Sequence, residues 1–206
     1  MVPLMHNTRQ ECRVLREGRR LRLADVTVTQ NGRDVAQGRA VFVRPSPTPG
    51  GEVWSDPVSL PAPPVNDAAW VDGPRVLSED GDAAIDNFDL WRDPKQRKQL
   101  WFRLGYDLVA GEPTSGFVRA ACVADAANPL TNWGSEGLQF VNSDVSMMLV
   151  RAPEGRHIGL VARDRQVDNG IAVGTATMHD QQGPIGTCVV TSLTSEVPMQ
   201  LPDRAG

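Results

Sequence analysis

The sequence predicts an α+β fold in which antiparallel strands wrap around one helix. Two stretches, 8–44 and 99–194, show the alternation of apolar and polar residues that is typical of strands. An Asn-Gly pair lies between two apolar runs of the first stretch, and this dipeptide is the strongest short-range signal for a hairpin. Within the second stretch, residues 117–125 instead repeat their apolar side chains at helical spacing.

The composition fits a globular protein and argues against several functional classes. The 206 residues correspond to about one large or two small domains, with 40% hydrophobic and 22% charged residues. The net charge of −4 argues against nucleic acid as a partner, because such proteins usually carry a basic excess. The longest apolar run, 120–124, is far shorter than the roughly 20 residues of a membrane span. We therefore expect neither nucleic acid nor a membrane as a partner.

The cysteines and the first residues indicate a cytoplasmic location. Cys12, Cys122 and Cys188 are odd in number and widely spaced, which is typical of free thiols in a reducing compartment. The first seven residues lack the basic start and the apolar stretch of a signal peptide.

The first patterned stretch predicts three antiparallel strands. Asn31-Gly32 is expected to form a two-residue turn, because both turn positions need positive φ. Between Leu23 and Val26 the alternation changes phase, which is typical of a β-bulge within that strand.

The second patterned stretch predicts a strand, a helix and four further strands. Pro113 is expected in the first turn of the helix, where its missing N–H costs nothing, and Asn128-Pro129 is expected to end the helix. The strands are expected at 100–106, 138–150, 158–165, 171–179 and 185–193.

The proline-rich middle of the chain separates the two stretches. Residues 45–97 hold nine of the sixteen prolines and three of the five tryptophans, with little periodicity. We therefore expect a partial N-terminal unit (1–44), a proline-rich linker (45–97), a C-terminal unit (98–194) and a tail (195–206).

Short internal matches indicate a duplication. Residues 17–23 match 154–160, and residues 24–44 match 172–193 in their threonine-bearing strand, glycine turn and apolar return strand. The spacing predicts an insertion near 164–169 in the second copy. The strand and helix that precede the second copy have no counterpart before the first, so the first unit is expected to lack both.

Several motifs resemble one known family. They are Gly18-Arg19-Arg20-Leu21, Asp125-Ala126-Ala127-Asn128, Phe140-Val141-Asn142-Ser143-Asp144-Val145-Ser146, Gly170-Ile171-Ala172-Val173-Gly174 and Gly183-Pro184-Ile185-Gly186. With the strand and helix order, they resemble the thioesterase-like superfamily of double-hotdog proteins, the acyl-CoA thioesterase II type in its actinobacterial branch. The resemblance implies a double hotdog whose first hotdog lacks its opening strand and helix. Either the start codon is placed too far downstream, or the chain completes its sheet as a homo-oligomer, which would cover the open edge.

Asp125 is the most informative position for chemistry. It shares a helix face with Phe117, Val118, Ala121 and Cys122, so the spacing predicts a buried carboxylate and a cysteine in the core. A buried carboxylate is costly unless it is paired. Asp125 is therefore either a helix-end residue bonded to the following turn or a catalytic carboxylate that orients or deprotonates a water.

The resemblance implies a site around this aspartate. Related thioesterases combine an aspartate at this place with two polar side chains, which fall here on Asn142 and on Thr191, where better-known members carry glutamine. The expected substrate contacts are Asn128, Trp133 and Phe117, although Asn128 also fits a helix cap and tryptophans are often packing residues. The coenzyme A part of the substrate would lie near basic residues, and the candidates are Arg151, Arg156, Arg163 and Arg165. The alternative is that these arginines only form a solvent-exposed face, as charged strand residues often do.

Other chemistries have less support. The resemblance also covers a hydratase branch of the hotdog superfamily, which needs a histidine near its aspartate. We expect His6, His157 and His179 on strands or loops, in structural or exposed roles, which argues against that reaction. The chain has no Cys-x-x-Cys, no histidine pair at helical spacing and no serine elbow, so we expect no metal and no cofactor. The resulting hypothesis is hydrolysis of acyl-CoA to a free acid and coenzyme A. The alternative is a non-catalytic hotdog that binds acyl thioesters or is structural.

Overall fold

A computed structural model describes residues 8–63, 73–77 and 92–199. The chain divides into two compact units, residues 1–54 and residues 55–206. The division falls within the proline-rich span. Among the described residues, no helix is long and apolar enough to cross a membrane.

The first unit contains the three expected antiparallel strands in the order β1-β2-β3. They are β1 (Thr8–Glu17), β2 (Leu21–Gln30) and β3 (Arg33–Val43). Asn31 and Gly32 have φ angles of 51° and 77°, so the predicted turn is confirmed. The irregularities lie on the flanking strands: Leu15 in β1 and Val35 in β3 are the extra residues. The prediction of a bulge within β2 is therefore wrong, although Leu15 lies opposite the place where the pattern of β2 changes phase.

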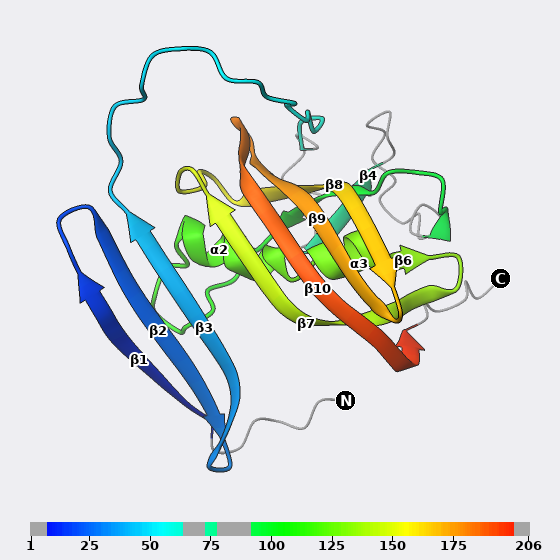
Figure 1. Ribbon diagram of the computed structural model, residues 1–206, viewed down its shortest axis with the longest axis horizontal. Coiled ribbons are helices and arrows are strands. Elements are labelled where there is room, and N and C mark those ends of the chain that lie inside the picture. The colour runs from blue at the N-terminus through cyan, green and yellow to red at the C-terminus, as the bar shows by residue number, and fades with distance from the viewer. Residues whose placement is uncertain (1–7, 64–72, 78–91, 200–206) are drawn as a thin grey trace. The chain divides into compact units, whose positions relative to one another are not determined.

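The second unit is a curved sheet of seven strands in the order β4-β5-β8-β9-β10-β7-β6, which wraps around the helices (Figure 1). All its pairings are antiparallel. The strands are β4 (Gly73–Leu77), β5 (Gln99–Arg103), β6 (Trp133–Gly134), β7 (Gly137–Leu149), β8 (His157–Asp168), β9 (Ile171–Asp180) and β10 (Gly183–Met199).

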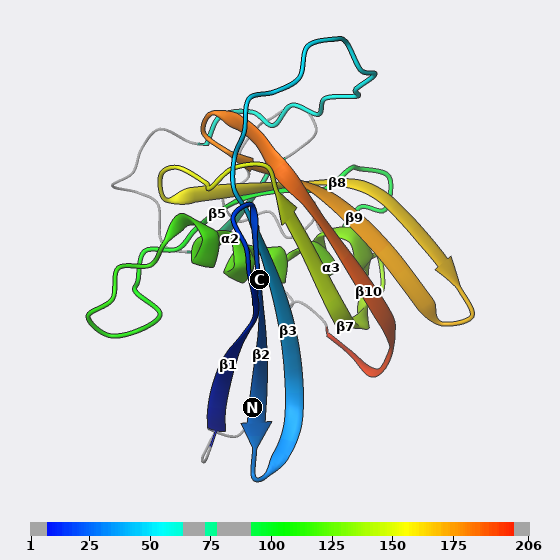
Figure 2. The same ribbon diagram turned by 60° about the vertical axis from the view of Figure 1, so that its left-hand side comes forward.

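The four long strands predicted from the sequence are confirmed as β7 to β10. The remaining differences are in the flanking segments. β4 lies in the span expected to be a linker, and β10 continues to Met199, within the expected tail. The region expected to be an insertion is the end of β8, followed by an Asn169-Gly170 turn with φ angles of 46° and 77°. Figure 2 shows β8, β9 and β10 as adjacent long strands, a meander with the same order as β1, β2 and β3.

The helical segment is divided into two helices by a tight turn. Helix α2 (Gly116–Ala124) begins after Ser115, whose Oγ accepts a hydrogen bond from the Val118 N–H at 3.2 Å. Pro113 therefore precedes the helix and is not in its first turn. Helix α3 (Ala127–Asn132) includes Asn128-Pro129, so the expectation that this pair ends the helix is wrong. Pro129 lies in the first turn of α3, where no intrahelical partner for its N–H is lost.

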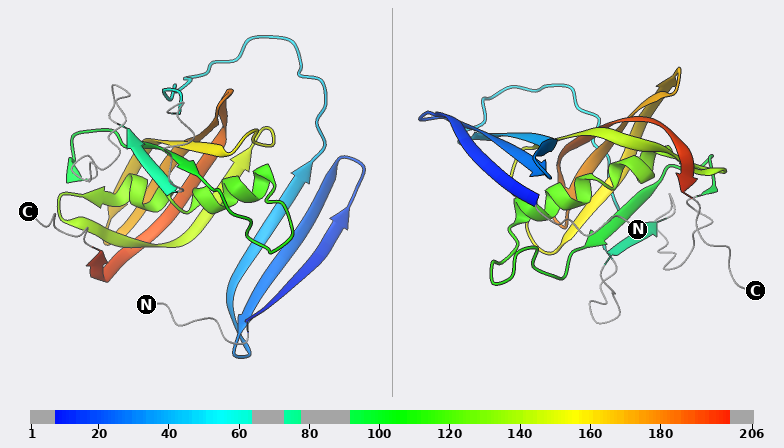
Figure 3. Two further views of the ribbon diagram at one scale, coloured as in Figure 1. Left: turned by 180° about the vertical axis from the view of Figure 1, so that it is seen from behind. Right: turned by 90° about the horizontal axis from the view of Figure 1, so that it is seen from below.

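Small residues bring the helices close to the concave side of the sheet (Figure 3). The packed side of α2 consists of Ala120, Val123 and Ala124, which are all at most 2% exposed. On β9, a Cβ added at Gly174 would collide with the side chain of Thr131. A glycine here thus permits the close approach of α3.

The opposite side of α2 is partly exposed. Phe117 is 40% exposed, and Ala121 and Cys122 are also exposed. The prediction that this face packs into the core is therefore wrong for these residues. Alanines at the other positions allow a closer approach to the sheet than a phenylalanine would, so the small residues form the packed side.

The segment at 55–63 is attached to the outside of the same sheet. Trp101 Nε1 donates to the Pro61 carbonyl at 2.7 Å, and the Nε2 of His179 lies 2.8 Å from the Val58 carbonyl. Arg163 forms an ion pair with Asp56 at 2.7 Å. Trp101 and His179 therefore have structural roles.

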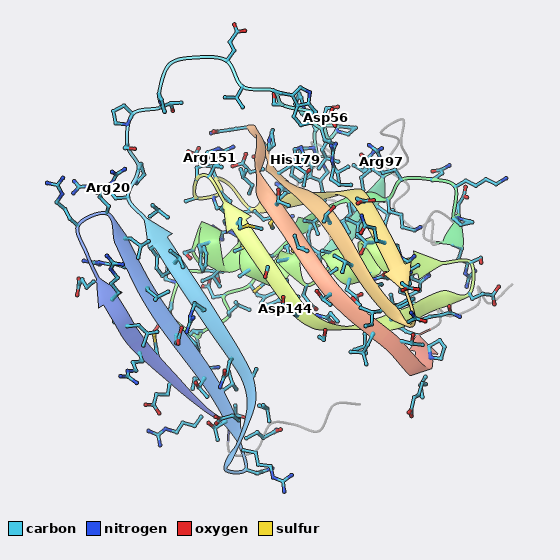
Figure 4. The ribbon with its side chains drawn as sticks, in the orientation of Figure 1. Arg20, Asp56, Arg97, Asp144, Arg151 and His179 are labelled. Carbon is cyan, nitrogen blue, oxygen red and sulfur yellow. The ribbon has the colours of Figure 1, made fainter. Side chains whose placement is uncertain are left out.

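A buried carboxylate ties the β9–β10 turn to the β7–β8 loop. Asp180 is 2% exposed and accepts two hydrogen bonds from Arg151, at 2.5 and 2.6 Å. It also accepts from the backbone N–H groups of Glu154 and Gln182, each at 2.9 Å. Burial alone would raise the pKa of Asp180, but these four hydrogen bonds together hold it below its usual value. Arg151 lies at this end of the sheet (Figure 4).

We expect Asp180→Ala to lower the free energy of unfolding by about 3 kcal/mol at pH 7, because it leaves Arg151 and two N–H groups without their acceptor. The folded-state pKa is depressed, so this stabilisation is present above the ordinary pKa of about 4 and is lost as the pH falls below it. Urea unfolding at pH 7 and pH 3 measures both effects. Asp168→Ala, at an exposed position, is the matched control. If the free energy of unfolding of Asp180→Ala differed from that of the wild type by the same amount at both pH values, the charge of Asp180 would not be the source of the stabilisation.

Candidate active site

The structure brings together Asp125, at the end of α2, and Asn142, on β7. Asp125 follows the last residue of α2, with φ −61° and ψ −30°. Asn142 Nδ2, from β7, donates to Asp125 Oδ1 at 2.8 Å. The Asp125 side chain thus bonds to the sheet and not to the following turn, where only its backbone carbonyl accepts the Asn128 N–H at 3.2 Å.

Asp125 is exposed in this unit. The prediction that Asp125 is a buried carboxylate is therefore wrong, because Asp125 shares the exposed side of α2 with Phe117 and Cys122. What remains is a carboxylate with one oxygen fixed by an amide and with its other oxygen accessible. Within the described residues, Asp125 Oδ2 accepts no hydrogen bond.

A bulge in β7 aims Asn142 at the helices. Asp144 pairs with Thr191 and Asn142 pairs with Ser192, which leaves Ser143 as an extra residue on β7. The Ser143 hydroxyl donates to the Thr191 carbonyl at 3.1 Å. On β10, Cys188, Val190 and Ser192 are buried on the helix side of the sheet.

Thr191 lies on the other face of β10. Successive side chains of a strand point to opposite faces, and Val190 and Ser192, its neighbours in the chain, hold the buried face. The structure therefore does not bring the Thr191 side chain to Asp125. Ser192, which is 1% exposed and pairs directly with Asn142, occupies the helix side instead.

Asn128 is the centre of a buried hydrogen-bond network behind this pair. Its Oδ1 accepts from Ser192 Oγ and from Asn132 Nδ2, both at 2.9 Å, and its Nδ2 donates to the Phe140 carbonyl at 3.2 Å. Asn128 is 4% exposed and Asn132 is 6% exposed. The network ties α3 to both β7 and β10, and it thereby holds the turn that carries Asp125.

The network continues from Asn132 to a surface cavity. Arg165 Nε donates to Asn132 Oδ1 at 2.8 Å, and the Arg165 guanidinium lies 5.2 Å from the centroid of the Phe140 ring. Both residues line a cavity of about 510 Å³ at the C-terminal end of α3, together with Trp133. Of the four arginines expected near coenzyme A, Arg163 also lines this cavity, whereas Arg151 is bound to Asp180.

A buried thiol lies beneath the aspartate. Cys188 is fully buried, and its Sγ donates to the Ala124 carbonyl at 3.4 Å. Burial raises the pKa of the Cys188 thiol to about 11, and the charge of Asp125 adds to this shift. Cys188 is thus a core residue, whereas Cys122, which was expected in the core, is exposed.

The described part of the chain holds no group of three His, Cys, Asp or Glu side chains placed to bind a metal ion. His157 and His179 are buried at 6% and 2% exposure on β8 and β9. His6 lies outside the described residues.

Sequence reasoning missed two residues of this region, Ser192 and Asn132. It named Arg165 as a candidate for coenzyme A binding, but not as a hydrogen-bond partner of Asn132. The bulge at Ser143 determines that Ser192 and not Thr191 faces Asn142, and no local motif marks that bulge. Asn132 lies four residues after Asn128, and this helical spacing is a signal that could have revealed the buried pair.

The curved antiparallel sheet around a helix is a hotdog fold. The chain belongs to the acyl-CoA thioesterase family, since residues 17–193 match the family model for the acyl-CoA thioesterase C-terminal domain. The comparison with curated protein sequences gives no match.

Solved structures agree with this fold at low sequence identity. An acyl-CoA thioesterase II from Mycobacterium marinum is 20% identical, with a TM-score of 0.57 over 95% of this chain and 76% of the other. A tesB protein from Mycobacterium avium subspecies paratuberculosis is 16% identical, with a TM-score of 0.56 over 91% and 71%. A hotdog-fold protein of unknown function from Alicyclobacillus acidocaldarius is 17% identical, with a TM-score of 0.60 over 92% and 73%.

We expect Cys188 to resist alkylation in the folded protein, because its thiol is buried and its raised pKa leaves little thiolate at pH 8. Iodoacetamide labelling followed by mass spectrometry should give two labelled cysteines in the native protein and three in urea. The variant Cys122→Ser should reduce the native number to one. Rapid labelling of Cys188 in the native state would show that the core around Asp125 is open.

Proposed function

We propose that the protein hydrolyses an acyl-CoA thioester to a free acid and coenzyme A, using a water held by Asp125. The observation that supports this proposal most directly is the 2.8 Å hydrogen bond from Asn142 Nδ2 to Asp125 Oδ1. It fixes the carboxylate so that its second oxygen points away from the amide. Membership of the acyl-CoA thioesterase family supports the substrate class.

In the proposed reaction, Asp125 accepts a proton from the water as the water oxygen attacks the thioester carbonyl carbon. The tetrahedral intermediate then collapses and the carbon–sulfur bond breaks. The sulfur of coenzyme A leaves and takes up the proton that Asp125 accepted, which returns Asp125 to its carboxylate form. A positioned base of this kind contributes about 10²- to 10⁴-fold to a rate. The Asn142 amide keeps the carboxylate in one orientation during this transfer.

The expected substrate contacts have different roles in this proposal. Phe117 lies on the partly exposed side of α2, the side that also carries Asp125, so we place the acyl chain along this side. Trp133 lines the cavity at the C-terminal end of α3. Asn128 is buried and hydrogen-bonded through both amide atoms, so it supports the site from behind. Cytoplasmic location and a homo-oligomer remain predictions.

The position of Thr191 favours the alternative, a hotdog that binds acyl thioesters without hydrolysing them. Its side chain is not on the helix side, so the water would have Asp125 and Asn142 as its polar neighbours. We propose instead that Thr191 acts through its backbone, because its carbonyl accepts the Ser143 hydroxyl and so maintains the bulge that aims Asn142.

Asp125→Asn should lower kcat/KM for acyl-CoA by about 100-fold or more, because the variant has no base for the water. Asn142→Ala should lower it about tenfold through the loss of one hydrogen bond to a carboxylate. Thiol release from short, medium and long acyl-CoA esters measures both. The matched control is Asp144→Asn, because Asp144 is an exposed carboxylate on β7, the strand that carries Asn142 (Figure 4). A folded wild type without turnover would favour the binding protein.

Thr191→Val should change kcat/KM less than twofold, because the substitution preserves the backbone carbonyl. Ser192→Ala should lower the free energy of unfolding by about 1 kcal/mol, since Asn128 loses a donor, and should also reduce activity. Steady-state kinetics and urea unfolding on the two variants compare neighbouring residues on opposite faces. A large loss of activity in Thr191→Val, with Ser192→Ala unaffected, would mean that the strand register differs in solution.

A further inference from the structure

The cavity at the C-terminal end of α3 is strongly cationic in a chain whose net charge is −4. It is lined by five basic residues and by two acidic ones. The basic residues come from the segment before β5 and from β8: Lys95, Arg97, Lys98, Arg163 and Arg165. Such a concentration of one sign of charge in a concave surface attracts anions.

The two acidic residues of the cavity, Glu136 and Asp164, are outnumbered by its five basic residues. Asp164 accepts hydrogen bonds from the Arg165 N–H and from Gln166 Nε2, at 2.8 and 3.2 Å, so it is engaged by its own strand. Arg163 is the one arginine of the cavity with an ion pair among the described residues, to Asp56. Arg97 is exposed and has no such partner (Figure 4).

One lysine of the cavity is buried without a carboxylate. Lys98 is 8% exposed, and its Nζ donates to the backbone carbonyl of Asp93 at 3.3 Å. Within the described residues, no carboxylate forms an ion pair with it. Burial lowers the pKa of Lys98, and the charge of Asp93 opposes that shift. A bound anion would compensate this buried ammonium group.

Arg165 links the cavity to the candidate active site. Its Nε is held by Asn132, and the stacked Phe140 ring restrains the guanidinium plane. Asn132 in turn bonds to Asn128, three residues after Asp125. Asn132 is the last residue of α3 and lies seven positions after Asp125 in the chain.

We propose that this cavity binds an anionic group of the substrate while the thioester lies at Asp125. The proposal deepens the proposed function and rests on it for the identity of the substrate. Two groups share the required chemistry: the phosphates of coenzyme A, and a carboxylate at the far end of the acyl chain. An arginine fork binds either group with two parallel hydrogen bonds.

Calorimetric titration with two probes that cannot be hydrolysed tests the proposal. Adenosine 3′,5′-bisphosphate represents the phosphate-bearing half of coenzyme A, and adipate represents an acyl chain with a terminal carboxylate. We expect one of them to bind, with binding that weakens as salt is added. Binding of the first assigns the cavity to coenzyme A, and binding of adipate alone assigns it to the acyl group.

Two variants locate the binding. Arg165→Gln should lower the affinity for the probe that binds about tenfold or more, because charged hydrogen bonds to it are lost. Arg97→Gln should also weaken it, and this exposed side chain can be removed without touching the buried network. Arg33→Gln, in the β2–β3 hairpin of the first unit, is the matched control for charge and should leave affinity unchanged.

The outcomes separate this proposal from the thioesterase proposal. If neither probe binds, or if all three variants bind equally well, the cavity is not an anion site even where acyl-CoA is hydrolysed. If a probe binds and both cavity variants lose it while no acyl-CoA ester is hydrolysed, the anion site stands and the catalytic proposal fails.

Discussion

The position of the helices on the sheet depends on one buried amide, that of Asn128. Its three hydrogen bonds reach Ser192 on β10, Asn132 on α3 and the Phe140 carbonyl on β7. A buried amide with an unmet hydrogen bond costs about 1 to 3 kcal/mol, so the helix end has few alternative positions. Asp125 precedes this anchor by three residues, and its contact with Asn142 follows from the anchor. The site is thus held by a fully bonded polar layer within an apolar core.

Much of this fold was predictable because its signals are local. The four long strands, the Asn31-Gly32 turn and the existence of a helix followed from alternation, helical spacing and turn chemistry. The bulges were not predictable in the same way. The phase change in β2 correctly marked a place of irregular pairing, but its pairing partner carries the extra residue. The bulge at Ser143 left no signal in the hydrophobic pattern, and it decides the face on which Thr191 lies.

The helix illustrates how a correct element can still be assigned the wrong face. The large apolar residues of α2 suggested that Phe117 and Cys122 point into the core, but the alanines on the other side pack there. Small residues permit a shorter distance between helix and sheet, and the glycine at 174 on β9 completes the fit. For the same reason, Asp125, which lies on the face of Phe117 and Cys122, was predicted to be buried although it is exposed. The motif resemblance nonetheless paired it with Asn142, because that inference did not depend on burial.

We propose that Asp125 activates a water and does not attack the thioester itself. A single turnover in oxygen-18 water, followed by mass spectrometry of the acid and of the peptide that contains Asp125, tests this most directly. We expect the acid to carry one heavy oxygen after the first turnover and Asp125 to carry none. Heavy oxygen in Asp125, with an unlabelled acid, would show attack by the carboxylate and would contradict the proposed mechanism.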